Sequence, residues 1–278
     1  MAIHAQNISS NRKSSAGKRH PLKNQKVFAW VVKRLVRGWS PEQISGRLKL
    51  VFKNDLEMRI CPETIYSFVY SEKYKYRKFW EYFPRGHKKR RKWHGRKVSR
   101  ASIPHRISIH ERPKVIDKNT EFGHFEGDSV VGRNHKGGVH TEVERLTRMY
   151  FAVKVEAINS EDALKAQIMM FSNLPVKSVT LDNGKENYLH YKLNKLGIQT
   201  YFADPYSSWQ RGSNEYHNSL LRRCFPKKTD FSKVTQEDIN SCVWEINNTP
   251  RKCLGYYTAN EVFLSKLNNQ RVAIQSRM

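Results

Sequence analysis

The spacing of apolar residues predicts a helical segment over residues 27–80. In VFAWVVKRLVRG, apolar residues recur at intervals of three and four, the period of an α-helix with one buried face, and Gly38 ends the stripe. Two further segments, SPEQISGRL and CPETIYSFVY, place a proline at the first helical position, and Ser40 with Gln43 matches a capping box. These short helices fit either a helix-turn-helix unit or a small helical subdomain without that role, and the pattern alone leaves both open.

Beyond Pro113 the pattern changes to alternating apolar and polar positions, which is typical of half-buried β-strands. Consecutive segments of this type predict antiparallel strands at GHFEGDSVVG, GGVHTEVERLTR and MYFAVKVEAI. A helix capped by Ser160, a strand at VKSVTLD, a helix ending at Gly197 and a strand at IQTYFADP come next, before a helix in SNEYHNSLLRRCF. The expected fold class is therefore α/β: a mixed five-stranded sheet with helices, preceded by a small helical domain.

Charge is distributed unevenly along the 278 residues. Lys and Arg number 51 against 25 Asp and Glu, a net charge of +26, and residues 1–113 alone hold 28 basic and 7 acidic side chains. A basic surface of this kind usually binds nucleic acid, because each neutralised phosphate releases condensed counterions. Ribosomal or merely solubilising charge would also suit the front part, but it leaves the α/β part unexplained.

The densest charge lies at residues 85–100, where RGHKKRRKWHGRKVSR contains nine Lys or Arg and no acid. Self-repulsion keeps such a block extended, so it is expected to be a linker. It either follows a phosphate backbone without reading sequence, with Trp93 stacking on a base, or serves only as a solvated tether. The candidates for DNA binding in this block are Lys88, Lys89, Arg90, Arg91, Lys92, Trp93 and Arg96.

The expected organisation has polar ends and two folded parts. Residues 1–26 lack any apolar period and are expected to be disordered, and residues 266–278 form a second polar tail. Between these tails we expect a helical DNA-binding domain at residues 27–80, a basic linker at residues 81–113 and the α/β core at residues 114–265.

The four cysteines, Cys61, Cys224, Cys242 and Cys253, are far apart and form no C-x-x-C pair. We therefore expect buried, reduced thiols, with neither a disulfide framework nor a cysteine zinc site. No run of about 18 apolar residues occurs, and the first residues lack the apolar core of a secretory signal. A cytoplasmic, nucleoid-associated protein without a membrane partner is the expectation.

Three carboxylates occupy comparable places in the α/β part. Asp128 lies in the first strand, Asp182 follows the fourth, and Glu215 stands near the start of a helix. If the first strand lies beside the fourth, the two aspartates come close together, and their repulsion requires a cation. Oxygen ligands suit Mg²⁺, and two such ions about 4 Å apart clamp the attacking and leaving oxygens of a phosphoryl transfer. Taken singly, DNG is an ordinary turn, and an acid at a helix start favourably opposes the helix dipole.

The neighbours of these carboxylates are consistent with a cleft. Asn183 and Gly184 allow a tight turn that exposes the preceding aspartate, because both residue types tolerate positive φ. On the helix that follows, Glu215 shares a face with Ser219 and Arg222. A second row on this helix has the same spacing and is expected to face the core: Tyr216, Leu220 and Cys224.

Several motifs, in this order and spacing, resemble a known family: EGDSVVG, TLDNGKE, DPYSSWQRGSNE, FPKKTDF and PRKCLGY. They are similar to the catalytic half of bacterial transposases of the insertion-sequence-30 family, which belong to the DDE group with a ribonuclease H-like, integrase-type core. The helical motifs GWSPEQISGRL and ETIYSFVY resemble that family's second DNA-binding region. The resemblance covers roughly residues 28–265 and rests on long, specific motifs.

The resemblance implies a function and a set of site residues. It places the family's catalytic, metal-binding carboxylates on Asp128, Asp182 and Glu215, which would hold two Mg²⁺ ions, with Mn²⁺ as a substitute. Such a site cleaves DNA strands at the ends of an insertion sequence and transfers them to target DNA, with the protein acting as a homo-oligomer. Candidates for holding phosphate near the site are Arg211, Arg222 and Arg223, although a solvated helix face explains these arginines as well.

One departure from the family leaves other functions open. Family members usually begin with a further helix-turn-helix, whereas only a short polar tail precedes Phe28. A truncated, catalytically silent DNA-binding remnant, acting as a repressor or end-binding protein, is therefore the alternative expectation. A ribonuclease H-like nuclease that cuts DNA and never joins it is a third.

Overall fold

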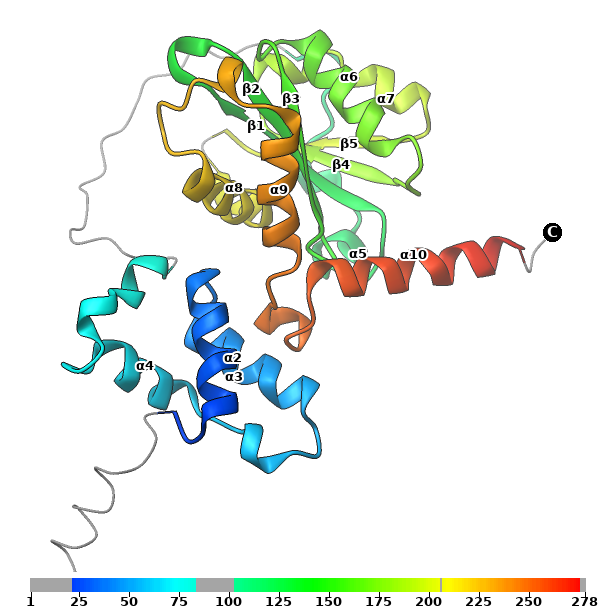
Figure 1. Cartoon of the computed structure of the whole chain (residues 1–278). Helices are drawn as coiled ribbons and strands as arrows, with labels where there is room; N and C mark the ends of the chain where they lie inside the picture. The colour runs from blue at the N-terminus through cyan, green and yellow to red at the C-terminus, as the bar shows by residue number, and fades with distance from the viewer. Residues whose placement is uncertain (1–21, 84–102, 206, 276–278) are drawn as a thin grey trace, which may run out of the picture. The chain divides into compact units, whose positions relative to one another are not determined.

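The computed structural model describes residues 22–83, 103–205 and 207–275 (Figure 1). These residues belong to two compact units. The first unit comprises Met1–Arg91 and Pro250–Tyr257, and the second comprises Lys92–Thr249 and Thr258–Met278, as far as each is described. The first unit is helical, and the second contains the sheet.

The helical unit packs α2 (Gln25–Val36), α3 (Pro41–Val51) and α4 (Pro62–Tyr70) around one apolar core. The expected capping box at the start of α3 is present, since Ser40 Oγ accepts from the N–H of Gln43, and Gln43 Oε1 accepts from the N–H of Ser40. The unit also holds short 3₁₀ turns at Leu56–Met58, Lys75–Arg77 and Phe79–Tyr82. Its core residues include Val31, Leu35, Ile44, Leu48, Ile65 and Phe68.

The segment Pro250–Tyr257 completes the helical unit from far along the chain. Gln43 Nε2 donates to the carbonyl of Pro250 at 2.9 Å, and Arg47 donates to the carbonyl of Tyr256 at 3.2 Å. The Tyr256 ring lies so close to Gly46 that a Cβ at this glycine would be 2.4 Å from it. The motif PRKCLGY is thus a packing partner of α3.

The second unit is built on a mixed five-stranded sheet of order β3-β2-β1-β4-β5. The strands are β1 (His124–Val131), β2 (Gly138–Glu144), β3 (Tyr150–Val155), β4 (Ser178–Leu181) and β5 (Gln199–Phe202). The first three pair antiparallel, while β4 pairs in parallel with β1 and with β5. This arrangement confirms the mixed five-stranded sheet expected from the sequence, including the adjacency of β1 and β4.

Helices cover both faces of this sheet (Figure 1). Those on the two faces are α6 (Ser160–Phe171) with the short α7 (Tyr191–Lys195), and α8 (Gly212–Cys224) with α9 (Gln236–Asn247). The unit also contains the short α5 (Lys114–Asp117) and α10 (Ala259–Gln275). One apolar core joins α8 and α9 to β2 and β3. A second core, which includes Phe125, Leu164, Phe171, Val179 and Leu193, joins α6 and α7 to the sheet.

Two helix boundaries differ from expectation because asparagine side chains form hydrogen bonds with groups close by in the sequence. Asn159, not Ser160, caps α6, since its Oδ1 accepts from the N–H groups of the second and third helical residues. The helix predicted over ENYLHYKLNKLG is broken into a 3₁₀ turn at Lys185–Asn187 and the short α7. Asn187 is held there by hydrogen bonds to the carbonyl and carboxylate of Asp182.

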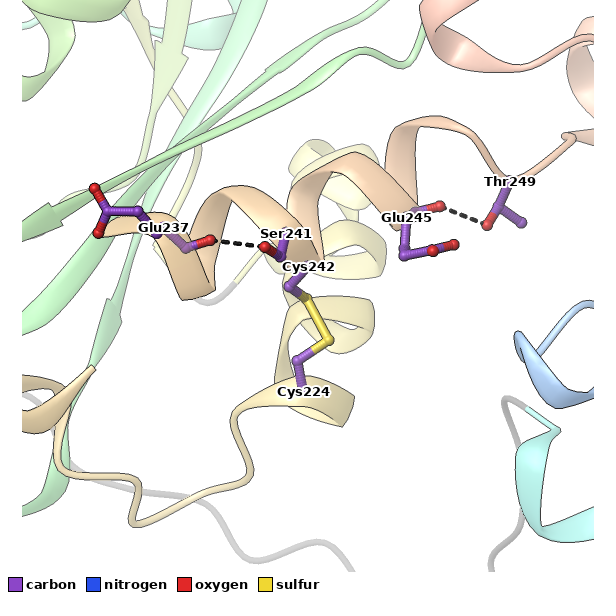
Figure 2. Close-up of a disulfide and its surroundings, with 6 residues drawn as sticks. All are labelled: Cys224, Glu237, Ser241, Cys242, Glu245 and Thr249. Carbon is purple, nitrogen blue, oxygen red and sulfur yellow. Dashed lines mark hydrogen bonds between the residues drawn. A yellow bond between two sulfur atoms is a disulfide. The ribbon is translucent and has the colours of Figure 1, made fainter. Parts of the chain in front are cut away.

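The expectation for the cysteines was wrong. Cys224 at the end of α8 and Cys242 in α9 form a disulfide, with a Cα–Cα distance of 6.5 Å (Figure 2). The other two cysteines, Cys61 and Cys253, are free and exposed, not buried. Spacing along the chain gives no sign of this pair, because packing of α9 against α8 brings together residues that are 18 positions apart.

The helices in the described part of the chain include none that is long and apolar enough to cross a membrane.

Candidate active site

Asp128 and Asp182 lie on neighbouring parallel strands. Glu126 of β1 is in register with Thr180 of β4, so the two aspartates, each two residues further on, occupy matching positions at the same edge of the sheet. Parallel strands present equivalent positions at the same end, and this geometry brings the carboxylates together. The predicted adjacency of these two residues is therefore seen in the structure.

The positive charge between the two carboxylates comes from Arg211. Its Nη1 lies 3.7 Å from Oδ1 of Asp128, and its Nη2 lies 3.5 Å from Oδ2 of Asp182. The same guanidinium donates a hydrogen bond of 2.9 Å from Nη1 to the carbonyl of Gly127. Arg211 was expected to hold phosphate, and in this structure it lies between the two aspartates and offsets part of their negative charge.

Asp128 is held by groups from β1 and α8. Its Oδ1 accepts from the N–H of Ser129 at 2.9 Å, and its Oδ2 accepts from Nδ2 of Asn218 at 3.0 Å. Burial raises the pKa of Asp128, Arg211 opposes that rise, and the Asp182 carboxylate adds to it. The carboxylate is therefore costly to ionise at this position unless a cation lies nearby.

Asp182 is held by the turn that follows its strand. Its Oδ1 accepts from the N–H of Gly184 at 2.9 Å and from Nδ2 of Asn187 at 2.8 Å. Asn183 points the other way, with Nδ2 donating to the carbonyl of Ala203 at 2.7 Å. Because Oδ1 is occupied by two donors, Oδ2 is the oxygen directed at Arg211.

A further carboxylate, Glu186, lies near the pair and was not singled out from the sequence. Its Oε2 lies against Gly184, where an added Cβ would be only 2.4 Å away. Burial raises the pKa of Glu186, and the negative charges of Asp182 and Asp128 add to the rise. The only sequence signal for this residue is its place in the DNGKE motif.

Among the described residues, Glu215 does not join the two aspartates in a cluster of three side chains that could hold a metal ion. It is exposed in the first turn of α8, and no hydrogen bond or ion pair joins it to either of them in the described residues. The row expected to face the core also differs, since Tyr216 is 47% exposed. The buried residues of α8 are instead Asn214, His217 and Leu221.

Polar contacts explain this orientation of α8. The backbone N–H of Asn214 donates to Oε2 of Glu126 at 3.0 Å, and its Nδ2 donates to the Glu126 carbonyl at 2.7 Å. Arg145 pairs with the other oxygen of this buried glutamate. One turn later, the His217 ring stacks on Tyr150, with centroids 5.3 Å apart. These contacts fix α8 against the sheet and present Asn218 to Asp128.

The donor set suits a divalent cation in part. Two carboxylates converge on one cationic group, and oxygen ligands are what Mg²⁺ and Mn²⁺ prefer. Within the described residues, however, no three His, Cys, Asp or Glu side chains come close enough together to hold a metal ion. The aspartate pair thus fits the predicted metal, and the predicted third ligand is not in contact with it.

Curated relatives are similar to most of this chain, although no protein-family model matches it. The transposase for insertion sequence element IS4351 of Bacteroides fragilis is 37% identical over 88% of this chain and 75% of its own length. The transposase for insertion sequence element IS1086 of Cupriavidus metallidurans is 32% identical over 86% and 73%. Transposase InsI for insertion sequence element IS30A of Escherichia coli is 36% identical over 84% of this chain and 63% of its own length.

The chain belongs to the insertion-sequence-30 family of DDE transposases. This finding confirms the resemblance carried by the sequence motifs. Among solved structures, the catalytic core domain of BIV integrase is similar, with a TM-score of 0.44 and 16% identity over 54% of this chain and 98% of that one. The chain spans about two thirds to three quarters of the length of the transposases named above.

The remaining DNA-binding candidates of this family member have different surroundings. Arg222 is half-buried on α8, with Nη2 donating to the carbonyl of Val131 at 2.8 Å, and burial lowers the pKa of its guanidinium. Arg223 is exposed. The basic block from Lys88 to Arg96 lies outside the described residues.

Proposed function

We propose that this transposase cleaves DNA strands at the ends of an insertion element and joins the freed 3′ ends to target DNA in a metal-dependent reaction. The observation that carries the proposal is the pair Asp128 and Asp182, held on adjacent parallel strands and directed at one cation. Family membership supports the same chemistry. The sheet geometry and the relatives are independent lines of support.

Asp128, Asp182 and Glu215 would hold Mg²⁺ or Mn²⁺ at this edge of the sheet. Two bound ions would supply an activated water or 3′-hydroxyl and stabilise the leaving oxygen. The residues of the chain itself position the ligands. Asn218 and the N–H of Ser129 fix both oxygens of Asp128, while the N–H of Gly184 and Asn187 fix one oxygen of Asp182.

DNA is the proposed substrate, as element ends and as target, and the chain would act on it as a homo-oligomer in the bacterial cytoplasm. The strongly basic front part, with 28 basic against 7 acidic side chains in residues 1–113, would supply most of the affinity for the phosphate backbone. We assign residues 27–80, together with Pro250–Tyr257, to DNA binding and the rest of residues 114–265 to catalysis. Affinity from one part and chemistry from another can be separated by mutation.

A catalytically silent DNA-binding remnant is the second candidate. The separation of exposed Glu215 from the aspartate pair favours it. The retention of all three carboxylates in their family motifs favours the enzyme.

The test incubates purified full-length protein with end-labelled element-end DNA and Mg²⁺ or Mn²⁺, beside Asp182→Asn. Asp230→Asn, a change of another aspartate in the same unit, is the matched control. Nicked and joined products that need metal and vanish only in Asp182→Asn would support the transposase. DNA binding without products would support the remnant, and cleavage without joining would support a nuclease. Asp182→Asn should keep DNA affinity within a few-fold, since binding rests on the basic front part.

A further inference from the structure

We propose that Arg211 is an internal cation that occupies the metal position between Asp128 and Asp182 and must move away before a divalent ion binds. The inference rests on the proposed function, because it takes the aspartate pair as the metal site. It goes further by assigning Arg211 a role in the metal-free protein. In this role the arginine supplies the positive charge that the two carboxylates face in the metal-free protein.

The contacts of Arg211 resemble those of a bound counterion. The guanidinium touches both carboxylates, at 3.7 Å and 3.5 Å, and its side chain is only 11% exposed. Both distances exceed the usual length of a charge-assisted hydrogen bond, about 2.7 to 2.9 Å. Charge neutralisation therefore holds the arginine here more than directed hydrogen bonding does.

Arg211 is also poorly satisfied in this position. A guanidinium carries five N–H donors, and among the described residues Arg211 makes one hydrogen bond, to the carbonyl of Gly127. Its buried Nε has no hydrogen-bond partner among the residues described. Unsatisfied buried donors cost free energy. When a metal ion binds the two carboxylates instead, the Arg211 side chain is released and can form hydrogen bonds with other acceptors. DNA phosphate is such an acceptor, since arginine binds it through two parallel hydrogen bonds.

The position of Arg211 in the chain links this exchange to Glu215. Arg211 is the residue immediately before α8, and it caps the helix without a side-chain hydrogen bond. Gly212, which follows, has no atom within 4 Å of an added Cβ, so the space around the helix start is open. The first turn of α8 begins at the next residue and carries Glu215, so a backbone shift that withdraws Arg211 would also shift that turn. One displacement would thus free the aspartates and reset the turn that holds the predicted third ligand.

The test measures Mn²⁺ binding to the full-length, DNA-free protein by the electron paramagnetic resonance signal of free Mn²⁺. Arg211→Gln removes the competing charge and should bind Mn²⁺ about tenfold more tightly than the parent, a usual strength for two linked binding events. Arg211→Lys should fall between the two, because an ammonium keeps the charge but cannot bridge both carboxylates. Arg133→Gln, which removes an exposed arginine of the same unit, should match the parent.

A second readout reports movement of the helix start. Trp209 is 73% exposed and stands two residues before Arg211. Mg²⁺ should change the tryptophan emission of the parent, and the change should be absent from Trp209→Phe and from Arg211→Gln, in which nothing is displaced. A full emission change in Arg211→Gln would contradict the proposed movement.

The outcomes separate this inference from the proposed function. Equal Mn²⁺ affinity of the parent and Arg211→Gln, with binding lost in Asp182→Asn, would overturn the role of Arg211 and leave the metal site standing. Tight binding by Arg211→Gln that persists after Asp182→Asn is added would overturn both. The Arg211→Lys variant keeps a positive charge at the site and carries the test if the glutamine variant does not fold.

Discussion

The side-chain amide of Asn218 donates a 3.0 Å hydrogen bond to Oδ2 of Asp128. Asn218 lies on α8, one turn after Glu215, and its Oδ1 accepts hydrogen bonds from the hydroxyls of Thr141 and Tyr150. A donor held this firmly fixes the carboxylate rotamer of a residue that is to bind metal. The helix that carries the predicted third ligand therefore also orients the first aspartate.

Replacing Asn218 by aspartate should damage the site without unfolding the unit. The new carboxylate would face Asp128 at hydrogen-bond distance and raise the pKa of Asp128 further by like-charge repulsion. We expect strand cleavage to fall by roughly 10- to 100-fold, the usual cost of losing a residue that orients a metal ligand. The measurement is the cleavage rate on labelled element-end DNA. Asn240→Asp, at an exposed position of α9, is the control, and equal losses in both variants would contradict a specific role.

Replacing Asp128 by asparagine should stabilise the metal-free protein at neutral pH. Because burial raises the pKa of Asp128, the folded protein holds this proton more tightly than the unfolded chain does, and the ionised carboxylate costs stability. This loss of stability is absent below about pH 3.9, the pKa of aspartate in an unfolded chain, and it grows as the pH rises through the pKa of Asp128 in the folded protein. Urea unfolding in EDTA should show Asp128→Asn to be more stable than the parent at pH 7 and no different at pH 3. An equal gain in stability at both pH values would show that packing of the asparagine side chain, and not removal of the ionised carboxylate, causes the effect.

Replacing Gly46 by alanine should destabilise the helical unit. An added Cβ would lie 2.4 Å from the Tyr256 ring, so the ring or the segment around it must shift. Overpacking of this kind costs about 1–3 kcal/mol, to be measured by urea unfolding. Gly212→Ala, where no atom lies within 4 Å of the new methyl group, should not destabilise the protein. A loss as large at Gly212 would show that the Tyr256 contact is not the cause.

The cysteines should differ in their reaction with iodoacetamide. In denaturant without reductant, Cys61 and Cys253 should be alkylated, while Cys224 and Cys242 remain protected by their disulfide. After reduction, peptide mass spectrometry should find all four modified. Alkylation of all four cysteines before reduction would contradict the disulfide between Cys224 and Cys242.

The sequence predicted those features that depend on local pattern. The capping box at Ser40, the strand that contains Asp128 and the strand that ends just before Asp182 follow from short-range preferences. The meeting of the two aspartates follows once β4 pairs with β1. The inward face of α8 could not be predicted in this way. The apolar row that includes Tyr216 suggested one face, whereas hydrogen bonds to Glu126 and stacking on Tyr150 turn another face inward.

Contacts between segments that are distant in the sequence could not be predicted from local patterns either. Arg211 reaches the aspartate pair only because the turn before α8 lies at the same sheet edge, and no spacing rule relates these three residues. Glu186 carries a signal only as part of a motif, since its position against Gly184 depends on the fold of the turn. Such pairings need the tertiary structure.

Pro250–Tyr257 belongs to the helical unit, although the residues on both sides of it belong to the sheet unit. The chain therefore passes from one unit to the other at three places, and neither unit corresponds to one uninterrupted stretch of the gene. A chimera that exchanges only the front of two related genes would join a foreign α3 to the resident PRKCLGY segment. The two pieces that meet at Gly46 and Tyr256 must be inherited together for the helical unit to be exchanged intact.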